Sequence, residues 1–297
     1  MSWTSGRAGL TISAVSSLLA IPVPTIRSWE RRYGFPIPAR TDGRHRRYST
    51  DEIDQLRALR DEITRGRPAR DAVEVVRGLA SASDRNDLVS GVVEAAIRLD
   101  PAAVRTTLAE AAETLGVERA ICDVALPAMR EMGSRWKAGV CDTAHEHLAT
   151  EAVRVWLARQ SAMVPAAFRP FSIVLSCGPR DLHTIGLEAF GVILARRGWP
   201  IRTLGSQTPV SSLVTAVRAS EAGGAVISCH RALTRRPAVE SIVAVHRLPG
   251  VQALYGGAAF SAPTARRGVP GVYLGEDIVR AAEILERSLL DTVRVGA

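Results

Sequence analysis

Residues 22–34 have the sequence Pro-Val-Pro-Thr-Ile-Arg-Ser-Trp-Glu-Arg-Arg-Tyr-Gly, and this stretch decides the fold of the N-terminal part of the chain. Pro24 falls where the first turn of a helix tolerates a residue without an N–H group. Helical spacing puts Ile26 together with Trp29 or Tyr33 on the packed side of this helix. The opposite side is basic, with three arginines that reach outward: Arg27, Arg31 and Arg32.

A second short helix is expected before this stretch. Thr11 is a suitable N-cap for a helix that runs through Leu19, and residues 20–23 form a tight turn, so the two helices make a helix-turn-helix. Residues 34–48 are basic and rich in turn-forming residues, and a further helix follows them. This basic arm is expected to contact phosphates, and the alternative is a solvated loop on an ordinary helical domain.

The composition of the chain excludes several protein classes. Its 297 residues, 46% of them hydrophobic, are enough for roughly two or three domains with cores of their own, which excludes fibrous and disordered proteins. The net charge is +8, and the first 50 residues hold eight arginines against Glu30 and Asp42, so an acidic partner such as nucleic acid is expected there. The apolar runs are too short to cross a bilayer and no secretion signal opens the chain, which predicts a soluble, cytoplasmic protein with reduced cysteines.

The N-terminal residues resemble the winged helix-turn-helix of the MerR family of transcription regulators. The resemblance covers about 70 residues of a predicted domain 1–79 and rests on Pro24 to Arg27, Arg31 to Gly34, Pro38, Arg40, Gly43 and Arg46 to Tyr48. It implies that the second helix enters the major groove, that the arm grips the DNA backbone, and that a dimer binds an inverted repeat. The DNA-binding residues implied are Thr25, Arg27, Arg31, Arg32, Tyr33, Arg40, Arg44, Arg46, Arg47 and Tyr48. The sequence after Arg77 does not sustain apolar heptads, so something other than a long coiled coil must bring the copies together.

Residues 80–165 show helical periodicity throughout. Apolar residues recur at intervals of three and four in stretches that begin at Leu88, Val104, Val117 and His147. Four amphipathic helices of this length predict a four-helix bundle.

Residues 166–297 alternate between runs typical of strands and stretches typical of helices. The predicted strands are 171–176, 201–204, 225–228, 252–255 and 272–274, and the helices between them are 184–197, 209–222 and 235–246, with one more at the end. Alternation at this spacing predicts a doubly wound, mostly parallel, Rossmann-like α/β domain. The expected fold class is therefore multidomain: an α winged helix-turn-helix, a four-helix bundle and an α/β doubly wound sheet.

Polar or glycine-containing loops follow three of the predicted strands: residues 181–186, Ser228, and the pair Gly256 and Gly257. In a doubly wound sheet, ligands bind beyond the carboxyl ends of the strands. We therefore expect these three loops to converge at one edge of the sheet.

Asp181 and His183 lie two residues apart in the first of these loops. The carboxylate can accept one imidazole N–H and so fix the tautomer, which leaves the other nitrogen able to ligate a metal. Gly186 and the later glycine pair let a bulky group pass close to the backbone. A single histidine in a loop is, however, more often a surface or capping residue than a ligand.

The spacing of these residues resembles the cobalamin-binding domain of methionine synthase and of the base-off, His-on mutases. The residues that carry the resemblance are Asp181, His183, Gly186, Ser228, Gly256 and Gly257. It implies that His183 is the lower cobalt ligand and that Ser228 contacts the buried nucleotide tail. The family's Ser-x-Leu is Ser228-Cys229-His230 here, a departure expected to affect the tail contact and to leave the cobalt ligand untouched.

The bundle also carries a motif. Trp136, then nine residues, then Glu146 and His147 match the Trp-x9-Glu-His motif of the CarH and LitR photoreceptors, which join MerR, bundle and cobalamin domains in this order. The resemblance implies bound adenosylcobalamin, with Trp136 against the adenosyl group; the alternative places Trp136 in a core and the Glu-His pair on a helix surface.

Lys137 stands where relatives have a histidine that takes the upper cobalt position after light removes the adenosyl group. A protonated amine is a poor ligand, so water, His145 or His147 is expected there, or the cobalamin is held less firmly.

These observations predict a cobalamin-dependent transcriptional regulator: a repressor and light sensor rather than an enzyme. Adenosylcobalamin is expected to favour an oligomer, a dimer or a tetramer, that holds double-stranded DNA until light releases it. A regulator that senses cobalamin in the dark is an alternative that Lys137 favours. A cobalamin-dependent methyltransferase or mutase, and a regulator with no cofactor, are the other two.

Overall fold

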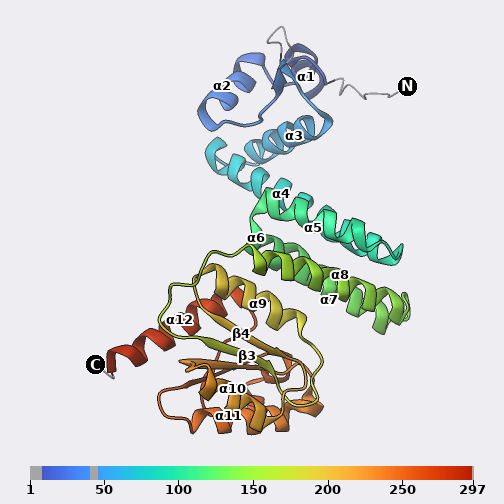
Figure 1. Cartoon of the computed structure of the whole chain (residues 1–297). Helices are drawn as coiled ribbons and strands as arrows, with labels where there is room; N and C mark the ends of the chain where they lie inside the picture. The colour runs from blue at the N-terminus through green and yellow to red at the C-terminus, as the bar shows by residue number, and fades with distance from the viewer. Residues whose placement is uncertain (1–8, 41–45, 296–297) are drawn as a thin grey trace. The chain divides into compact units, whose positions relative to one another are not determined.

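The computed structural model describes residues 9–40 and 46–295. The chain divides into two compact units, Met1–Asp87 and Leu88–Ala297, each with its own hydrophobic core (Figure 1). The predicted multidomain fold class is confirmed.

The N-terminal unit contains the predicted helix-turn-helix. Its elements are α1 (Ile12–Leu19), α2 (Val23–Tyr33), the short antiparallel strands β1 (Ala39–Arg40) and β2 (Arg46–Arg47), α3 (Thr50–Thr64), and the first part of α4 (Ala69–Ile97). Thr11 caps α1, because its side-chain oxygen accepts a hydrogen bond from the Ala14 N–H at 3.3 Å. Ile26 and Trp29 are both buried in the core, as helical spacing predicts.

Helix α4 runs without a break through the predicted boundary between residues 79 and 80. The compact units separate later, between Asp87 and Leu88. Residues 81–87 are mostly polar, and such a stretch can stay helical when all of its faces are solvated. The predicted domain boundary therefore falls inside a helix.

The bundle consists of the last part of α4 and three further helical segments. These are α5 (Pro101–Leu115); the run of α6 (Val117–Arg119), the π-helical η1 (Ala120–Ala125) and α7 (Leu126–Lys137); and α8 (Thr143–Ala162). The apolar positions that predict the bundle, among them Val92, Leu108 and Val153, are fully buried in one core. The structure thus contains the four predicted helices.

The α/β part forms a five-stranded parallel sheet in the order β4-β3-β5-β6-β7. In chain order the elements are β3 (Ile173–Cys177), α9 (Ile185–Arg196), β4 (Ile201–Gly205), α10 (Val210–Ala219), β5 (Gly224–Ser228), α11 (Arg235–His246), β6 (Gln252–Gly256), β7 (Val272–Tyr273) and α12 (Ile278–Val295). Three short 3-10 turns, Ala232–Thr234, Ala258–Phe260 and Pro263–Arg266, lie in the loops after β5 and β6. The predicted doubly wound topology is confirmed.

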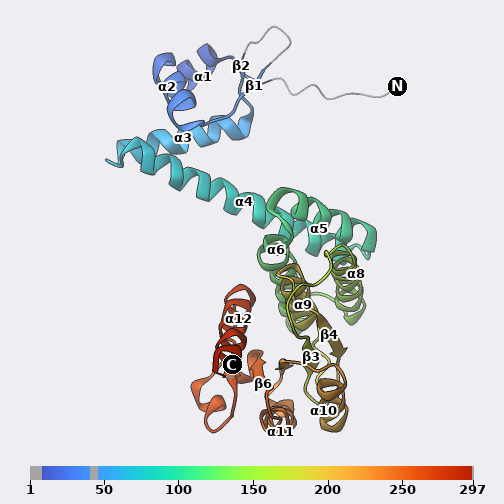
Figure 2. The same cartoon turned by 60° about the vertical axis from the view of Figure 1, so that its left-hand side comes forward.

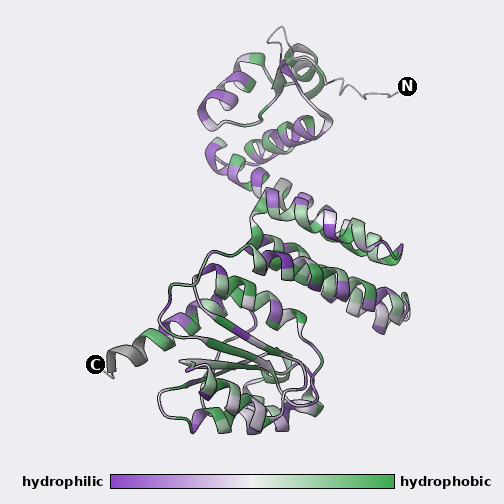
Figure 3. Ribbon diagram, viewed as in Figure 1, coloured by the Kyte–Doolittle hydropathy of each residue, from purple (hydrophilic) through white to green (hydrophobic). Residues whose placement is uncertain are grey.

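Helices cover both faces of this sheet. Figures 1 and 2 show α9 and α12 on one face and α10 and α11 on the other. Alternate residues of β3 serve the two layers: Ile173 and Leu175 join the core beneath α9 and α12, and Val174 joins the core beneath α10 and α11. The central strands are largely hydrophobic for this reason (Figure 3).

The bundle and the sheet share one core. Helix α8 packs along α9, and buried residues of both, such as Trp156 and Phe190, belong to the same hydrophobic cluster. The predicted bundle and α/β domain therefore form a single compact unit, in which α9 separates α8 from the sheet.

Candidate functional site

The predicted loops meet at the carboxyl edge of the sheet, and Asp181 lies at their centre. Its side chain is 1% exposed. Oδ1 accepts hydrogen bonds from the backbone N–H of His183 at 3.0 Å and from His183 Nδ1 at 2.8 Å, and Oδ2 accepts from the backbone N–H of His230 at 2.6 Å. One carboxylate therefore ties the loop after β3 to the loop after β5.

These three donors explain the ionisation of Asp181. Burial on its own raises the pKa of the carboxyl group, but the hydrogen bonds from His183 and His230 more than offset this and hold the pKa well below its ordinary value. An ionised Asp181 accepts a hydrogen bond from the protonated Nδ1 of His183. In a neutral imidazole, Nε2 then carries a free lone pair. The His183 side chain is 47% exposed, so this nitrogen is accessible to a metal.

His230 is a site residue that sequence reasoning missed. Its ring stacks on the ring of His183, with 4.6 Å between centroids and 27° between planes. Burial and the neighbouring His183 and Lys137 lower the pKa of His230, against the opposing effect of Asp181. His230 thus contacts the predicted ligand residue itself, because β3 and β5 are neighbours in the sheet and the residue two after Ser228 lies beside the His183 loop. That the departure at His230 leaves cobalt ligation untouched stays a prediction.

Ser228 takes part in a hydrogen-bonded chain beneath His183. Its hydroxyl donates to the Cys177 thiol at 3.3 Å, and the thiol donates to the backbone carbonyl of His183 at 3.6 Å. Cys177 is fully buried, and burial raises the pKa of its thiol to about 11, so the thiol keeps the proton that it donates. In this structure Ser228 supports the His183 loop through its hydrogen bond to Cys177.

The three predicted glycines differ in what they border. A Cβ at Gly186 meets nothing within 4 Å, so this glycine borders open space, whereas one at Gly256 makes ordinary van der Waals contact with the Gly275 carbonyl oxygen at 3.7 Å. Gly257 has φ +97° and a Cβ there would collide with the backbone of Cys229. Gly257 is thus required by the fold of the chain itself, and its predicted role toward a bulky ligand stays a prediction.

The bundle residues of the predicted site lie on α7 and α8. Trp136 is 49% exposed and is not a core residue, and its Nε1 donates to the Thr143 hydroxyl at 3.2 Å. Glu146 accepts a hydrogen bond from the Thr150 hydroxyl at 2.9 Å, and His147 is exposed beside it, with 3.7 Å from Nε2 to Glu146 Oε2. In the described part of the chain, no hydrogen bond joins Trp136, Glu146 or His147 to the Asp181 group.

His145 has a structural partner of its own. The backbone N–H of Asp142 donates to His145 Nδ1 at 3.1 Å, and Asp142 in turn caps α8 by accepting from the Ala144 N–H. His145 would have to leave this cap to bind a ligand through Nδ1.

The predicted DNA-binding residues fall into three groups. Arg27, Arg31 and Arg32 are exposed on α2, whereas Thr25 and Tyr33 are partly buried on the same helix. Arg40 lies in β1, and Arg44 lies outside the described residues. Arg46 and Arg47 are partly buried in β2, where Arg46 Nε pairs with Glu30 at 2.7 Å and Arg47 donates to the Gly9 carbonyl at 3.4 Å.

Tyr48 differs from the exposed arginines of this set. Its side chain is fully buried, and its hydroxyl donates to the Glu30 carboxylate, which also accepts from Arg46. Burial first, and then Glu30, raise the pKa of Tyr48 well above its ordinary value. Tyr48 therefore holds the arm against α2 and offers no exposed side-chain surface to DNA in this structure, although the resemblance places it among the DNA-binding residues.

We expect Tyr48→Phe to lower the free energy of unfolding of the N-terminal unit by about 1–2 kcal/mol, because the substitution removes a buried hydrogen bond to a charged group and keeps the ring. Chemical denaturation of the full chain measures this change. Tyr33→Phe is the control, since Tyr33 is only partly buried and is not bonded to Glu30. Equal stability of the two variants would contradict the role assigned to Tyr48.

Comparison with known proteins shows the family. Residues 10–79 match the MerR HTH family regulatory proteins, and residues 88–159 match the B12 binding domain family. The chain is 34% identical over 213 residues to the HTH-type transcriptional repressor CarA of Myxococcus xanthus, across 69% of this chain and 70% of CarA. The chain belongs to the MerR-type transcriptional regulators with a B12 binding domain. A second relative of this family, the HTH-type transcriptional repressor CarH of the same organism, is 29% identical over 223 residues, across 70% of this chain and 74% of CarH.

The structure agrees with this family's organisation. The B12 binding match begins at residue 88, where the second compact unit begins. That unit resembles the monomethylamine corrinoid protein of Methanosarcina barkeri, with a TM-score of 0.57 and 15% identity over 68% of this chain and 99% of that chain. At this identity the likeness confirms the fold of a bundle joined to a parallel sheet.

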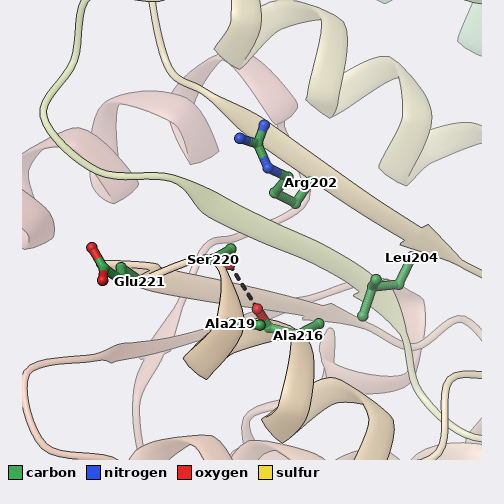
Figure 4. Close-up of a pocket in the computed structure, with 6 residues that line it drawn as sticks. All are labelled: Arg202, Leu204, Ala216, Ala219, Ser220 and Glu221. Atoms are coloured by element: carbon green, nitrogen blue, oxygen red, sulfur yellow. Dashed lines mark hydrogen bonds between the residues drawn. The ribbon is translucent and has the colours of Figure 1, made fainter.

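A shallow hollow of about 440 Å³ lies along β4 and the end of α10, lined by Arg202, Leu204, Ala216, Ala219, Ser220 and Glu221 (Figure 4). It contains none of the predicted site residues. In the described residues, no helix combines the length and the apolar character needed to span a membrane.

Proposed function

We propose that this chain is a repressor whose DNA binding is controlled by adenosylcobalamin and by light. The observation that carries the proposal is the pair of Asp181 and His183, in which an ionised carboxylate holds Nδ1 and leaves Nε2 accessible. This pair lies in a chain that also has an outward-facing set of arginines on α2.

The residues present fit a cobalamin. A neutral imidazole oriented by a carboxylate is a suitable cobalt ligand, and the open space beside Gly186 accepts a bulky group. Leu182 and Leu233 are exposed apolar residues in the loops around His183, and Trp136 is an exposed aromatic on the bundle. We propose that the bound ligand covers these exposed apolar groups.

In this proposal three residues of the site have defined roles. His183 would hold the group through Nε2, Asp181 would keep Nδ1 protonated, and Trp136 would cover the group from the bundle. The chemistry that the bound group would supply is a cobalt–carbon bond that green or blue light breaks. Without the adenosyl group Trp136 would have no partner, and the bundle would be free to move.

DNA binding follows from the number of N-terminal units that act together. One unit presents three exposed arginines on α2, which is a small interface, and joining several units in one oligomer raises the effective concentration of each at the operator. We propose that adenosylcobalamin favours a dimer or tetramer and that light reverses this. The bound ligand shifts the equilibrium between monomer and oligomer.

The experiment that tests this function uses the full chain loaded with adenosylcobalamin in the dark. We expect a base-off, His-ligated absorption spectrum and an oligomer in size-exclusion chromatography, and green light should change both. The cofactor-free chain kept under the same light is the control. Failure to bind any cobalamin would contradict the cofactor role, and an unchanged oligomer after complete photolysis would contradict the role of light.

Lys137 supports a second candidate, a regulator that senses cobalamin in the dark. The lysine is exposed at the end of α7, directly after Trp136, and it provides no neutral imidazole there. A cobalamin-bound oligomer that keeps its size after illumination is the result expected of this second function.

A further inference from the structure

Arg154 joins the bundle to the beginning of α9. From α8, its Nε contacts Glu188 Oε1 at 3.2 Å and its Nη2 donates to the Thr184 hydroxyl at 3.1 Å, while Nη1 pairs with Glu151 on its own helix. The arginine and Glu188 are both partly buried, so the pair is less screened than a surface ion pair. The guanidinium group is planar, so its three hydrogen-bond partners fix both its orientation and its distance from α9.

Thr184 is the residue directly after His183 and the N-cap of α9. The loop from Asp181 to Thr184 is therefore held at both ends: Asp181 is fixed by hydrogen bonds within the sheet edge, and Thr184 is fixed by Arg154. The position of His183 between these two residues depends on both attachments.

The same face of α8 leads back to the motif residue Glu146. Glu146, Thr150 and Arg154 follow one another at intervals of four, which places them along one side of the helix. Glu146 Oε1 accepts from the Thr150 hydroxyl at 2.9 Å. One side of α8 thus carries both a residue of the proposed cofactor site and the arginine that contacts the His183 loop.

We propose that Arg154 is a positioning residue that couples the placement of α8 to the placement of the His183 loop. Movement of α8 shifts the hydrogen bonds to Thr184 and Glu188, and the loop that carries His183 moves with them. The proposal rests on the proposed function for its consequence, which is that displacement of the bundle weakens the hold of His183 on its ligand. The coupling itself is a property of the cofactor-free chain.

The chain offers a matched control at the other end of α9. Glu118 of α6 pairs with Arg197, the residue that follows α9, with 3.4 Å between Oε1 and Nη2. Arg197 also pairs with Glu286, so Glu118→Gln leaves it with a partner. Glu118→Gln breaks a contact between the bundle and the α/β part that is remote from His183.

The first test measures hydrogen exchange in the full, cofactor-free chain. We expect Arg154→Gln to speed exchange of the amides at 183–188 by about fivefold or more, because the cap of α9 loses its contact with α8. Glu118→Gln should change these amides by less than about twofold. Equal exchange in the two variants would overturn the coupling, and this holds whether or not the chain binds cobalamin.

The second test measures the dissociation constant of adenosylcobalamin and the absorption spectrum of the complex. We expect Arg154→Gln to weaken binding about tenfold and to reduce the His-ligated form, Arg154→Lys to recover part of both, and Glu118→Gln to change neither. Thr184→Val, which keeps the shape of the side chain and removes the hydroxyl, should add little to Arg154→Gln. A lower melting temperature with an unchanged spectrum and affinity would show a structural role only and overturn the proposal.

Failure of the proposed function has a different signature. If the wild-type chain binds no cobalamin, the function fails, and the exchange experiment still decides whether Arg154 couples α8 to the loop. If the wild type binds and Arg154→Gln binds equally well, the function stands and the coupling fails.

Discussion

His183→Ala is expected to weaken cobalamin binding by at least about 100-fold and to abolish the His-ligated spectrum, because the substitution removes the one imidazole whose Nδ1 is held by Asp181 and whose Nε2 is accessible. Removing the coordinating nitrogen should reduce affinity more than mutation of the residues that support it, which typically costs about 10- to 100-fold in metal affinity. Equilibrium dialysis and absorption spectroscopy in the dark measure the two effects.

His246→Ala is the control for this variant. His246 is exposed at the end of α11 and belongs to none of the loops at the sheet edge. His230→Ala gives a further comparison: it removes the stacked ring but keeps the backbone N–H bonded to Asp181, so we expect a smaller loss than for His183→Ala. A His183→Ala chain that retains cobalamin as firmly as the wild type would refute the ligand assignment.

Asp181→Asn is expected to lower the free energy of unfolding of the second unit by about 2–4 kcal/mol and to weaken cobalamin binding. The buried carboxylate accepts from three N–H groups, and an amide in its place puts an NH₂ group against one of them. The variant loses acceptor capacity at a site that is 1% exposed, where water cannot replace it. Denaturant unfolding of the cofactor-free chain measures the change in stability.

The pH dependence of stability provides a second test of the contribution of Asp181. The pKa of Asp181 is lowered in the folded chain, so its stabilising contribution is complete above the ordinary pKa of the group and is lost as the pH falls below it. We expect the stability difference between wild type and Asp181→Asn to be constant above about pH 5 and to narrow below about pH 4. A difference that stays constant down to pH 3 would contradict the assignment.

Most of the fold could be predicted from the sequence because its signals are local. The helix Arg235–His246 has the predicted bounds, and Thr11 caps α1 as its position before an apolar run indicates. The pair Asp181 and His183 was predictable too, since two residues so close in the sequence can meet inside one loop. Helix α4 shows the limit of local signals, because it crosses the predicted boundary between residues 79 and 80 without a break.

The parts that escaped prediction depend on contacts between distant segments. The stacking of His230 on His183 requires that β3 and β5 be neighbours, and the burial of Tyr48 requires that Glu30 face the arm. Arg154 gives no sign of its contact with Thr184, because a charged residue on an amphipathic helix is usually solvated. These contacts follow from the order of the strands and the packing of α8, which no short stretch of sequence encodes.

The thiol beneath His183 makes the sheet edge suitable for chemical labelling. Cys177 and Cys229 are fully buried, and burial raises the pKa of both thiols, so a thiol reagent in neutral solution finds neither a thiolate nor a path. Reaction at Cys177 requires that the edge open, which also breaks its hydrogen bond to the His183 carbonyl. Its rate of modification by a thiol reagent therefore reports how often the sheet edge beneath His183 opens.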